Sequence, residues 1–213
     1  MMDTDDLIRS LAADTRRSAA PLSSAWWFAA GAAITIAAAI FIAALGPRPD
    51  IAAAAETPRF LLKFVITLTL AASAFGVARS LSRPGDAWRG AIPYLAAAPA
   101  LALIAVVAEL FLLPSNAWSA RLIGDNIVPC LTSIPLMGIG PLAIFLLALR
   151  HGAPTRPALA GAVAGLLAGG IAATFYAAKC TDDSPLFVAT WYTIAIAGLA
   201  LIGAAAASRI ARW

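Results

Sequence analysis

Long apolar runs separated by short polar breaks are the main pattern of this chain. Six of the runs are each about 20 residues long, the length that an α-helix needs to cross roughly 30 Å of hydrocarbon. Charged residues gather near the N-terminus and in the breaks. The pattern predicts an all-α polytopic membrane protein, a bundle of six transmembrane helices at about 25–45, 60–79, 91–113, 127–149, 157–179 and 186–207.

The composition narrows the classes of function. Of 213 residues, 62% are hydrophobic and 12% are charged, which argues against a water-soluble fold. No polar stretch between the apolar runs is long enough for a catalytic domain, and the chain has no HExxH, GxSxG, Cys-x-x-Cys or Walker-type glycine motif. The net charge of +4 is spread over many segments. We therefore expect no enzyme, no required cofactor and no direct contact with nucleic acid.

The distribution of basic residues predicts the orientation. Six spans place both termini on one side, and a cytoplasmic N-terminus puts ten Lys and Arg residues inside against five outside. Cytoplasmic loops of membrane proteins carry the excess of Lys and Arg. The expected arrangement is a tail at 1–24 and a transmembrane domain at 25–213, with the tail and the C-terminus in the cytoplasm.

Two charged residues fall inside the apolar runs. Lys63 and Glu109 are predicted about one turn from the outer ends of the second and third spans, so an ion pair between them is expected. Such a pair, or a lysine that reaches towards the interface, is a structural feature. A proton or ion pathway is the alternative, although transport normally needs further acidic groups at mid-membrane depth.

The fifth span carries Gly161, Gly165 and Gly169 at a spacing of four residues. This spacing puts the three glycines on one helix face, where another helix backbone can approach closely. The face is predicted to pack within the bundle, and a homodimer interface is the alternative.

The only two cysteines are expected at the same end of the bundle. Cys130 opens the fourth span and Cys180 closes the fifth, which places both at the outer face. In an oxidising compartment a disulfide is one outcome, and closing a loop of this length is worth ~4 kcal/mol in the chain-entropy model. A pair that responds to a metal or to oxidation is another, with Asp182 and Asp183 as further ligands for a transient soft or transition metal ion. Two unrelated thiols are the third.

The N-terminal tail has the pattern of a short amphipathic helix. Asp5 and Asp6 suit its positive end, and Leu7, Ile8 and Leu11 form a narrow apolar stripe. A helix of this length is marginal alone in water, so it gains by docking. A groove on a cytoplasmic protein suits its acidic start better than an anionic lipid surface does, and the inner loops of the bundle are the alternative.

Three parts of the chain together resemble the NrsF family. They are Thr4–Asp14, Leu149–Gly161 and Cys180–Tyr192, and the resemblance extends over essentially the whole chain. It implies a six-span anti-sigma factor of the bacterial inner membrane, which holds an extracytoplasmic-function sigma factor and releases it when a stress such as heavy metal is sensed outside. Cys130 and Cys180 match the two outer cysteines of the family.

The resemblance assigns the two ends of the molecule to different roles. Asp5, Asp6, Leu7, Ile8 and Leu11 become candidates for sigma-factor binding, and the cysteines become candidates for metal or redox sensing. Two other classes compete with this hypothesis: a small transporter or channel, suggested by Lys63 and Glu109, and a scaffold subunit of a membrane complex.

Overall fold

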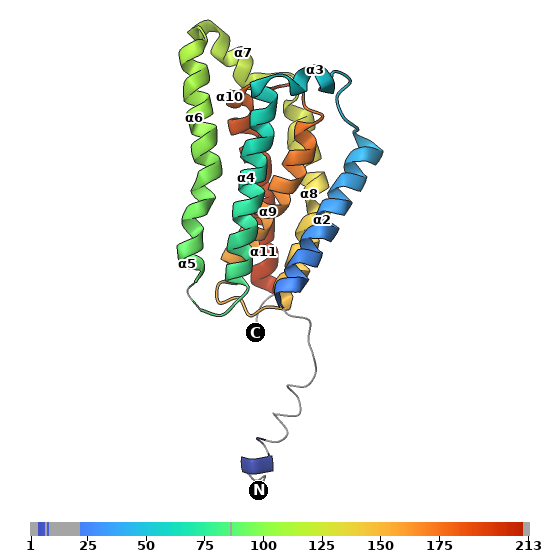
Figure 1. Ribbon diagram of the computed structural model, residues 1–213, viewed down its shortest axis with the longest axis vertical. Helices are drawn as coiled ribbons and strands as arrows, with labels where there is room; N and C mark the ends of the chain where they lie inside the picture. Colours follow the sequence, from blue (N-terminus) through green and yellow to red (C-terminus); the bar gives the residue numbers. More distant parts are fainter. Residues whose placement is uncertain (1–3, 7, 9–21, 86, 211–213) are drawn as a thin grey trace.

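The computed structural model describes residues 4–6, 8, 22–85 and 87–210 (Figure 1). All regular elements within these ranges are helical. The order is α2 (Leu22–Ala44), α3 (Ile51–Ala55), α4 (Pro58–Leu81), α5 (Trp88–Ala91), η1 (Ile92–Ala96), α6 (Ala97–Leu112), η2 (Ser115–Ala117), α7 (Trp118–Ile123), α8 (Ile127–Arg150), α9 (Pro157–Ala177), α10 (Pro185–Phe187), η3 (Val188–Tyr192) and α11 (Thr193–Ile210).

The six predicted runs are confirmed as six long apolar helices. In the described part of the chain, the stretches long and apolar enough to cross a membrane are Ser24–Ala44, Pro58–Leu81, Trp88–Leu112, Ile127–Arg150, Pro157–Ala177 and Pro185–Ile210. The third combines α5, η1 and α6, and the sixth combines α10, the π-helix η3 and α11. Figure 1 shows α2 beginning and α11 ending at one end of the bundle, with α3 and α7 at the other.

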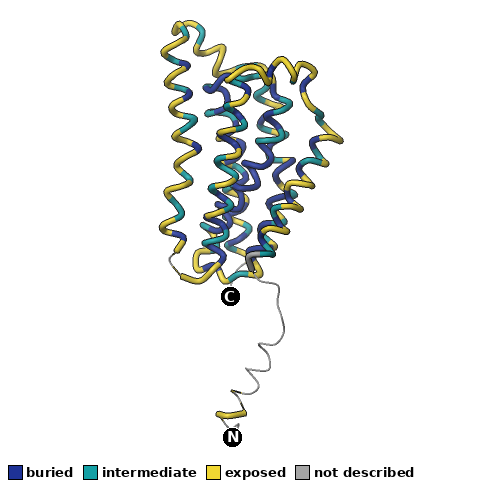
Figure 2. The backbone as a smooth tube through the Cα atoms, viewed as in Figure 1, coloured by how far each residue is buried: buried dark blue, intermediate teal, exposed yellow. Residues whose placement is uncertain are grey.

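The bundle is organised around α9. Of its most apolar window, 67% is buried, against 17% for the Trp88–Leu112 helix. Figure 2 shows this contrast, with α9 dark blue inside and α6 mostly exposed at one side. The outward surfaces of the other helices carry large exposed apolar side chains, including Phe28, Leu103 and Leu201. Such a surface suits a hydrocarbon solvent.

The glycine face of α9 packs within the bundle. A Cβ atom at Gly161 would collide with the carbonyl of Gly203, and one at Gly165 would collide with the carbonyl of Leu199. At Gly169 it would lie 2.8 Å from the side chain of Ile196. The three glycines therefore allow α9 and α11 to approach at backbone distance, and this face is occupied inside one chain.

Gly161→Ala is expected to destabilise the bundle, because the added methyl group meets the backbone of α11 rather than a flexible side chain. Overpacking of this kind typically costs about 1–3 kcal/mol. Gly198→Ala on α11 is the matched control, since nothing lies within 4 Å of its added Cβ. Thermal unfolding of both variants in detergent checks the prediction. Equal midpoints for the two would contradict the close α9–α11 packing.

Candidate functional site

The segment that joins α9 to α10, residues 178–184, lies at one end of the bundle. It carries a buried thiol and side chains that form hydrogen bonds and ion pairs with neighbouring elements. It begins where the amides of Lys179 and Cys180 bond the carbonyl of Tyr176, and it ends where Pro185 starts α10. The amide of Arg48 donates to the carbonyl of Ala178 at 3.0 Å. We call residues 178–184 the cysteine segment, because Cys180 lies within it.

The structure brings the two cysteines into one buried cluster. Cys130, in the first turn of α8, and Cys180 are both fully buried, and both thiols are free. They pack with Tyr176 of α9 and Tyr192 of η3. Each sulfur is therefore enclosed by apolar and aromatic groups and has the other thiol in its own cluster.

Burial controls the reactivity of Cys180. It raises the pKa of the Cys180 thiol, against the opposing effect of the nearby Lys63 ammonium. The thiol also donates to the carbonyl of Asp182, with sulfur and oxygen 3.7 Å apart. Because the thiolate is the nucleophile and metal ligand, a raised pKa lowers the fraction of Cys180 that is ready to react.

Two cations hold the cysteine segment through Asp183. The Nζ atom of Lys63 on α4 lies 2.6 Å from Asp183 Oδ1, and Arg48 Nη1 lies 2.9 Å from Asp183 Oδ2. Lys63 also donates to the carbonyl of Cys180 at 2.9 Å. Arg48 makes a second, two-pronged contact with Asp50, both distances being 2.7 Å. We call Arg48, Lys63 and Asp183 the charge clamp.

The charge clamp is buried enough to be structurally important. The side chain of Lys63 is 1% exposed, and that of Arg48 is 9% exposed. A buried ammonium is strongly unfavourable unless an anion and hydrogen-bond acceptors satisfy it. Asp183 supplies the anion and Cys180 supplies the acceptor. The position of the Cys180 backbone is thereby coupled to α4.

Glu109 has a different partner from the one expected. Its Oε2 accepts a hydrogen bond from Ser184 Oγ at 2.7 Å and from the amide of Leu186 at 3.1 Å. Its Oε1 lies 3.7 Å from Arg59 Nη2. A carboxylate at a helix N-terminus bonds amides that have no intrahelical acceptor. Glu109 of α6 therefore holds the start of α10.

The expected Lys63–Glu109 pair is thus replaced by two separate anchors. The cysteine segment offers a carboxylate to Lys63 and the Ser184 hydroxyl group to Glu109, and α10 adds the amide of Leu186. Lys63 has its anion in Asp183, and the cation nearest to Glu109 is Arg59, so the two buried charges are not paired with each other. Both charges hold a loop in place, which is a structural role.

Asp182 connects the cysteine segment to the start of α8. Its Oδ2 accepts from the amides of Asp125 and Asn126, at 3.0 and 2.9 Å, and from Asn126 Nδ2 at 2.8 Å. Gly124 makes this approach possible: its φ of 55° is favourable only for glycine, and a Cβ there would lie 2.7 Å from Asp182 Cγ. Asp182 thus holds the link that leads to Cys130.

These contacts limit the metal ligands available. The carboxylate of Asp182 is bonded to Asn126, and that of Asp183 is bonded to Lys63 and Arg48. Within the described residues, no group of three or more His, Cys, Asp or Glu side chains is placed to hold a metal ion. The donors that remain are the two sulfurs of Cys130 and Cys180, which suit a soft, thiophilic ion of low coordination number.

The far end of α4 is tied to two neighbours. Ser82 follows α4, and its Oγ accepts from Trp26 Nε1 of α2 at 3.1 Å. Its carbonyl accepts from the amide of Ala153, in the link between α8 and α9, at 3.1 Å. Helix α4 therefore has Lys63 near one end, against the cysteine segment, and Ser82 at the other, against α2 and the α8–α9 link.

The tail is described only in part. Asp5, Asp6 and Ile8 are helical and exposed. Leu7 and Leu11, the other two members of the predicted apolar stripe, lie outside the described residues. The binding role assigned to these five positions stays a prediction.

The fold and the site define a class of protein: a small bundle of six long apolar helices in which a cysteine-bearing segment is held by buried charges at one end. Comparisons with known proteins make the assignment narrower. The family model of NrsF, negative regulator of sigma F, matches residues 11–213. The chain belongs to the NrsF family.

Two curated relatives match along their whole length. The anti-sigma-F factor NrsF of Caulobacter vibrioides is 35% identical, and a probable anti-sigma-F factor NrsF of Azospira oryzae is 32% identical. In both cases 100% of this chain and 100% of the relative are covered. No solved structure matches the chain. Both relatives are named as anti-sigma factors, which are regulators.

Proposed function

We propose that this chain is a membrane-bound anti-sigma factor. It holds an extracytoplasmic-function sigma factor at the inner face of the bacterial inner membrane and releases it when the two cysteines react at the outer face. The observation that carries the proposal is the full-length similarity to anti-sigma-F factors. The six apolar helices and the excess of basic residues at one end support the membrane location and the orientation.

The proposed signal is a link between Cys130 and Cys180, either a disulfide bond or a metal ion that both sulfurs bind. In the oxidative case each thiol loses a proton, the pair gives two electrons to an oxidant, and the sulfur–sulfur bond forms. In the metal case two thiolates bind a soft ion and release two protons. Both reactions change how the cysteine segment sits against α8. The resting cluster favours the unreacted state, because it buries both thiols in apolar surroundings.

Helix α4 is the proposed element that carries the change across the membrane. The charge clamp connects it to the cysteine segment, and Ser82 connects it to α2 and the α8–α9 link. In the proposed mechanism α4 takes a second arrangement when the cysteines react, and this changes the inner face. A metal shifts this equilibrium only by as much as its affinity differs between the two states.

The tail is the proposed sigma-binding segment, with Leu7, Ile8 and Leu11 entering an apolar groove of the partner. Replacing Leu7 and Leu11 with Asp is expected to abolish capture, because two charges would enter that groove. A tagged pull-down of the sigma factor from membranes measures the effect. The matched control is Ser10→Asp with Ala13→Asp, which adds the same charge outside the apolar stripe of the predicted helix.

The two variants separate the candidate surfaces. Loss of capture in the Leu7, Leu11 variant alone supports binding through the stripe. Equal capture by both variants and the natural chain would move the binding surface to the inner loops. If no sigma factor is retained by the natural chain, the anti-sigma assignment itself is wrong.

A further inference from the structure

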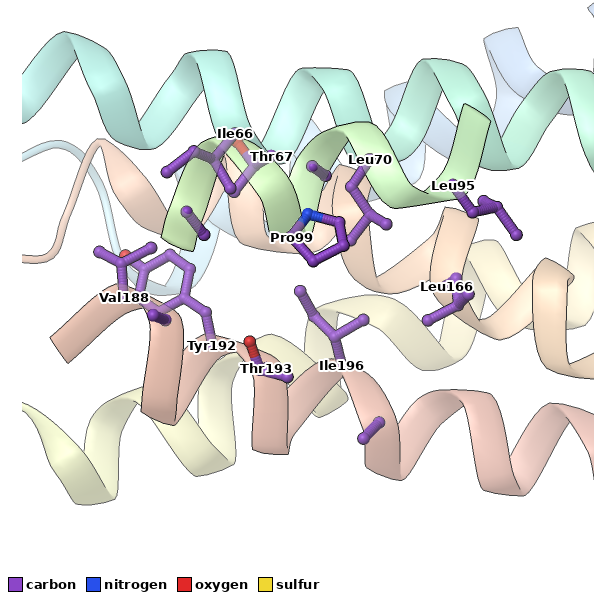
Figure 3. Close-up of a pocket in the computed structure, with 14 residues that line it drawn as sticks. Ile66, Thr67, Leu70, Leu95, Pro99, Leu166, Val188, Tyr192, Thr193 and Ile196 are labelled. Atoms are coloured by element: carbon purple, nitrogen blue, oxygen red, sulfur yellow. The ribbon is translucent and has the colours of Figure 1, made fainter. Parts of the chain in front are cut away.

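A cavity of about 230 Å³ lies in the helical bundle between α4, α6 and the η3–α11 helix. Figure 3 shows Ile66 and Leu70 of α4 on one side, Tyr192 and Ile196 on the other, and Pro99 of α6 between them. The lining is apolar except for a few hydroxyl groups. It takes no part in the charge clamp or in the contacts of Glu109.

The cavity is lined by small residues on α6 and by a π-helical turn on the facing side. On α6 the lining residues are Ala98, Pro99 and Ala102, which leave a shallow surface opposite α4. On the facing side the π-helix η3 contributes Val188, Ala189 and Tyr192. A π-helical turn is rare and is often found at a functional site. The small side chains of α6 thus leave the space between α4 and η3 unfilled.

The cavity opens towards the side of the bundle. Pro99, Thr193 and Ala197 line it and are themselves exposed, and the exposed apolar side chains of Leu103 and Ile194 belong to the same two helices. In a membrane this side faces hydrocarbon. An apolar cavity of about 150 Å³ holds a benzene molecule, so 230 Å³ has room for a stretch of a hydrocarbon chain.

We propose that this cavity binds one acyl chain of a membrane phospholipid. Methylene groups match the lining of Ile66, Leu70 and Ile196, and each that enters replaces contact with other lipid by contact with a shaped apolar wall. The inference rests on the membrane location given above, but it does not need the sigma factor.

An acyl chain at this place would support the sensing end of the molecule. Tyr192 lines the cavity and also packs in the cluster of Cys130 and Cys180. A bound chain would therefore contact Tyr192, which is itself part of the cysteine cluster. Lipid composition would then affect how readily the cysteine segment opens.

Photocrosslinking tests the proposal. The full chain is placed in nanodiscs that contain a phospholipid with a diazirine in its acyl chain, and the crosslinked residues are identified by mass spectrometry. Crosslinks are expected on Ile66 and Tyr192, which are buried and line the cavity, as well as on exposed residues such as Phe28 of α2. Lipid that only surrounds the bundle would reach Phe28 alone.

Two substitutions make the test specific. Ala102→Phe fills the cavity and is expected to remove the crosslinks to Ile66 and Tyr192, whereas Ala108→Phe, at an exposed position on the same helix, should leave them unchanged. Equal elution volume and helix content show that both variants fold. Crosslinks confined to exposed residues, or insensitive to Ala102→Phe, would overturn the acyl-chain site. Absence of crosslinks at Phe28 as well would overturn the membrane location with it.

Discussion

Replacement of Cys130 and Cys180 by serine is expected to abolish the response to oxidants and soft metals while sigma-factor capture persists. The carboxylates of Asp182 and Asp183 are engaged in other contacts, so the two sulfurs are the ligands that remain for a metal ion. A serine hydroxyl group neither forms a disulfide nor binds a soft ion strongly. A reporter gene behind a promoter that depends on the sigma factor gives the measurement. Induction by a thiol oxidant or a soft metal salt should fall to the uninduced level.

The single variants sharpen this test. If the signal is a bond that joins both sulfurs, Cys130→Ser and Cys180→Ser should each lose as much induction as the double variant. An alanine pair controls for the buried hydroxyl, since both sites are fully buried and an added polar group there needs a hydrogen-bond acceptor. Full induction in the double serine variant would sink the sensor assignment.

The position of the helices could be predicted from the sequence, because apolar runs of membrane-spanning length have few other interpretations. The common location of the two cysteines followed from the same reasoning. One starts a span and the other ends the next, so both fall at one end. The sequence also predicted that Gly161, Gly165 and Gly169 share one packed helix face. It did not identify α11 as the helix that packs there.

The contacts of the buried charges could not be predicted. The sequence gives the depth of Lys63 and Glu109 but neither the rotation of their helices nor the path of the loop between α9 and α10. The cysteine segment supplies a partner to each of them. Arg48 was missed as a site residue, although it is one of the five basic residues that the predicted orientation places outside, against the positive-inside trend, and this was an available signal.

These contacts bear on the competing transport hypothesis. A pathway needs ionisable groups that meet a solute or exchange protons. Here Lys63 is bonded to a carboxylate and a carbonyl, and Glu109 is bonded to a hydroxyl and an amide. Three of these four partners belong to the cysteine segment, and the amide of Leu186 belongs to α10, which follows it. The buried charges therefore favour a regulated loop over a conduction path.

Loss of the Asp183 charge is expected to release that loop. Asp183→Asn leaves Lys63 without its anion in a site where the side chain is 1% exposed. Removing one partner of a buried pair costs about 3–5 kcal/mol, and the partial exposure of Asp183 places the expected loss of unfolding free energy near the lower value. Unfolding in detergent measures it. In a reporter strain that carries this variant, transcription from the sigma-dependent promoter should be high without an inducer.

Two further variants decide whether the charge clamp is the cause. Asp50→Asn also removes a contact of Arg48, but its carboxylate is exposed, so it should change neither stability nor basal transcription appreciably. Lys63→Met combined with Asp183→Asn should be less destabilising than the sum of the single changes, because the unpaired ammonium is gone. Strict additivity, or a basal level in Asp183→Asn equal to that of Asp50→Asn, would show that Lys63 and Asp183 do not act together. A non-additive result with raised basal transcription would connect the clamp directly to release of the sigma factor.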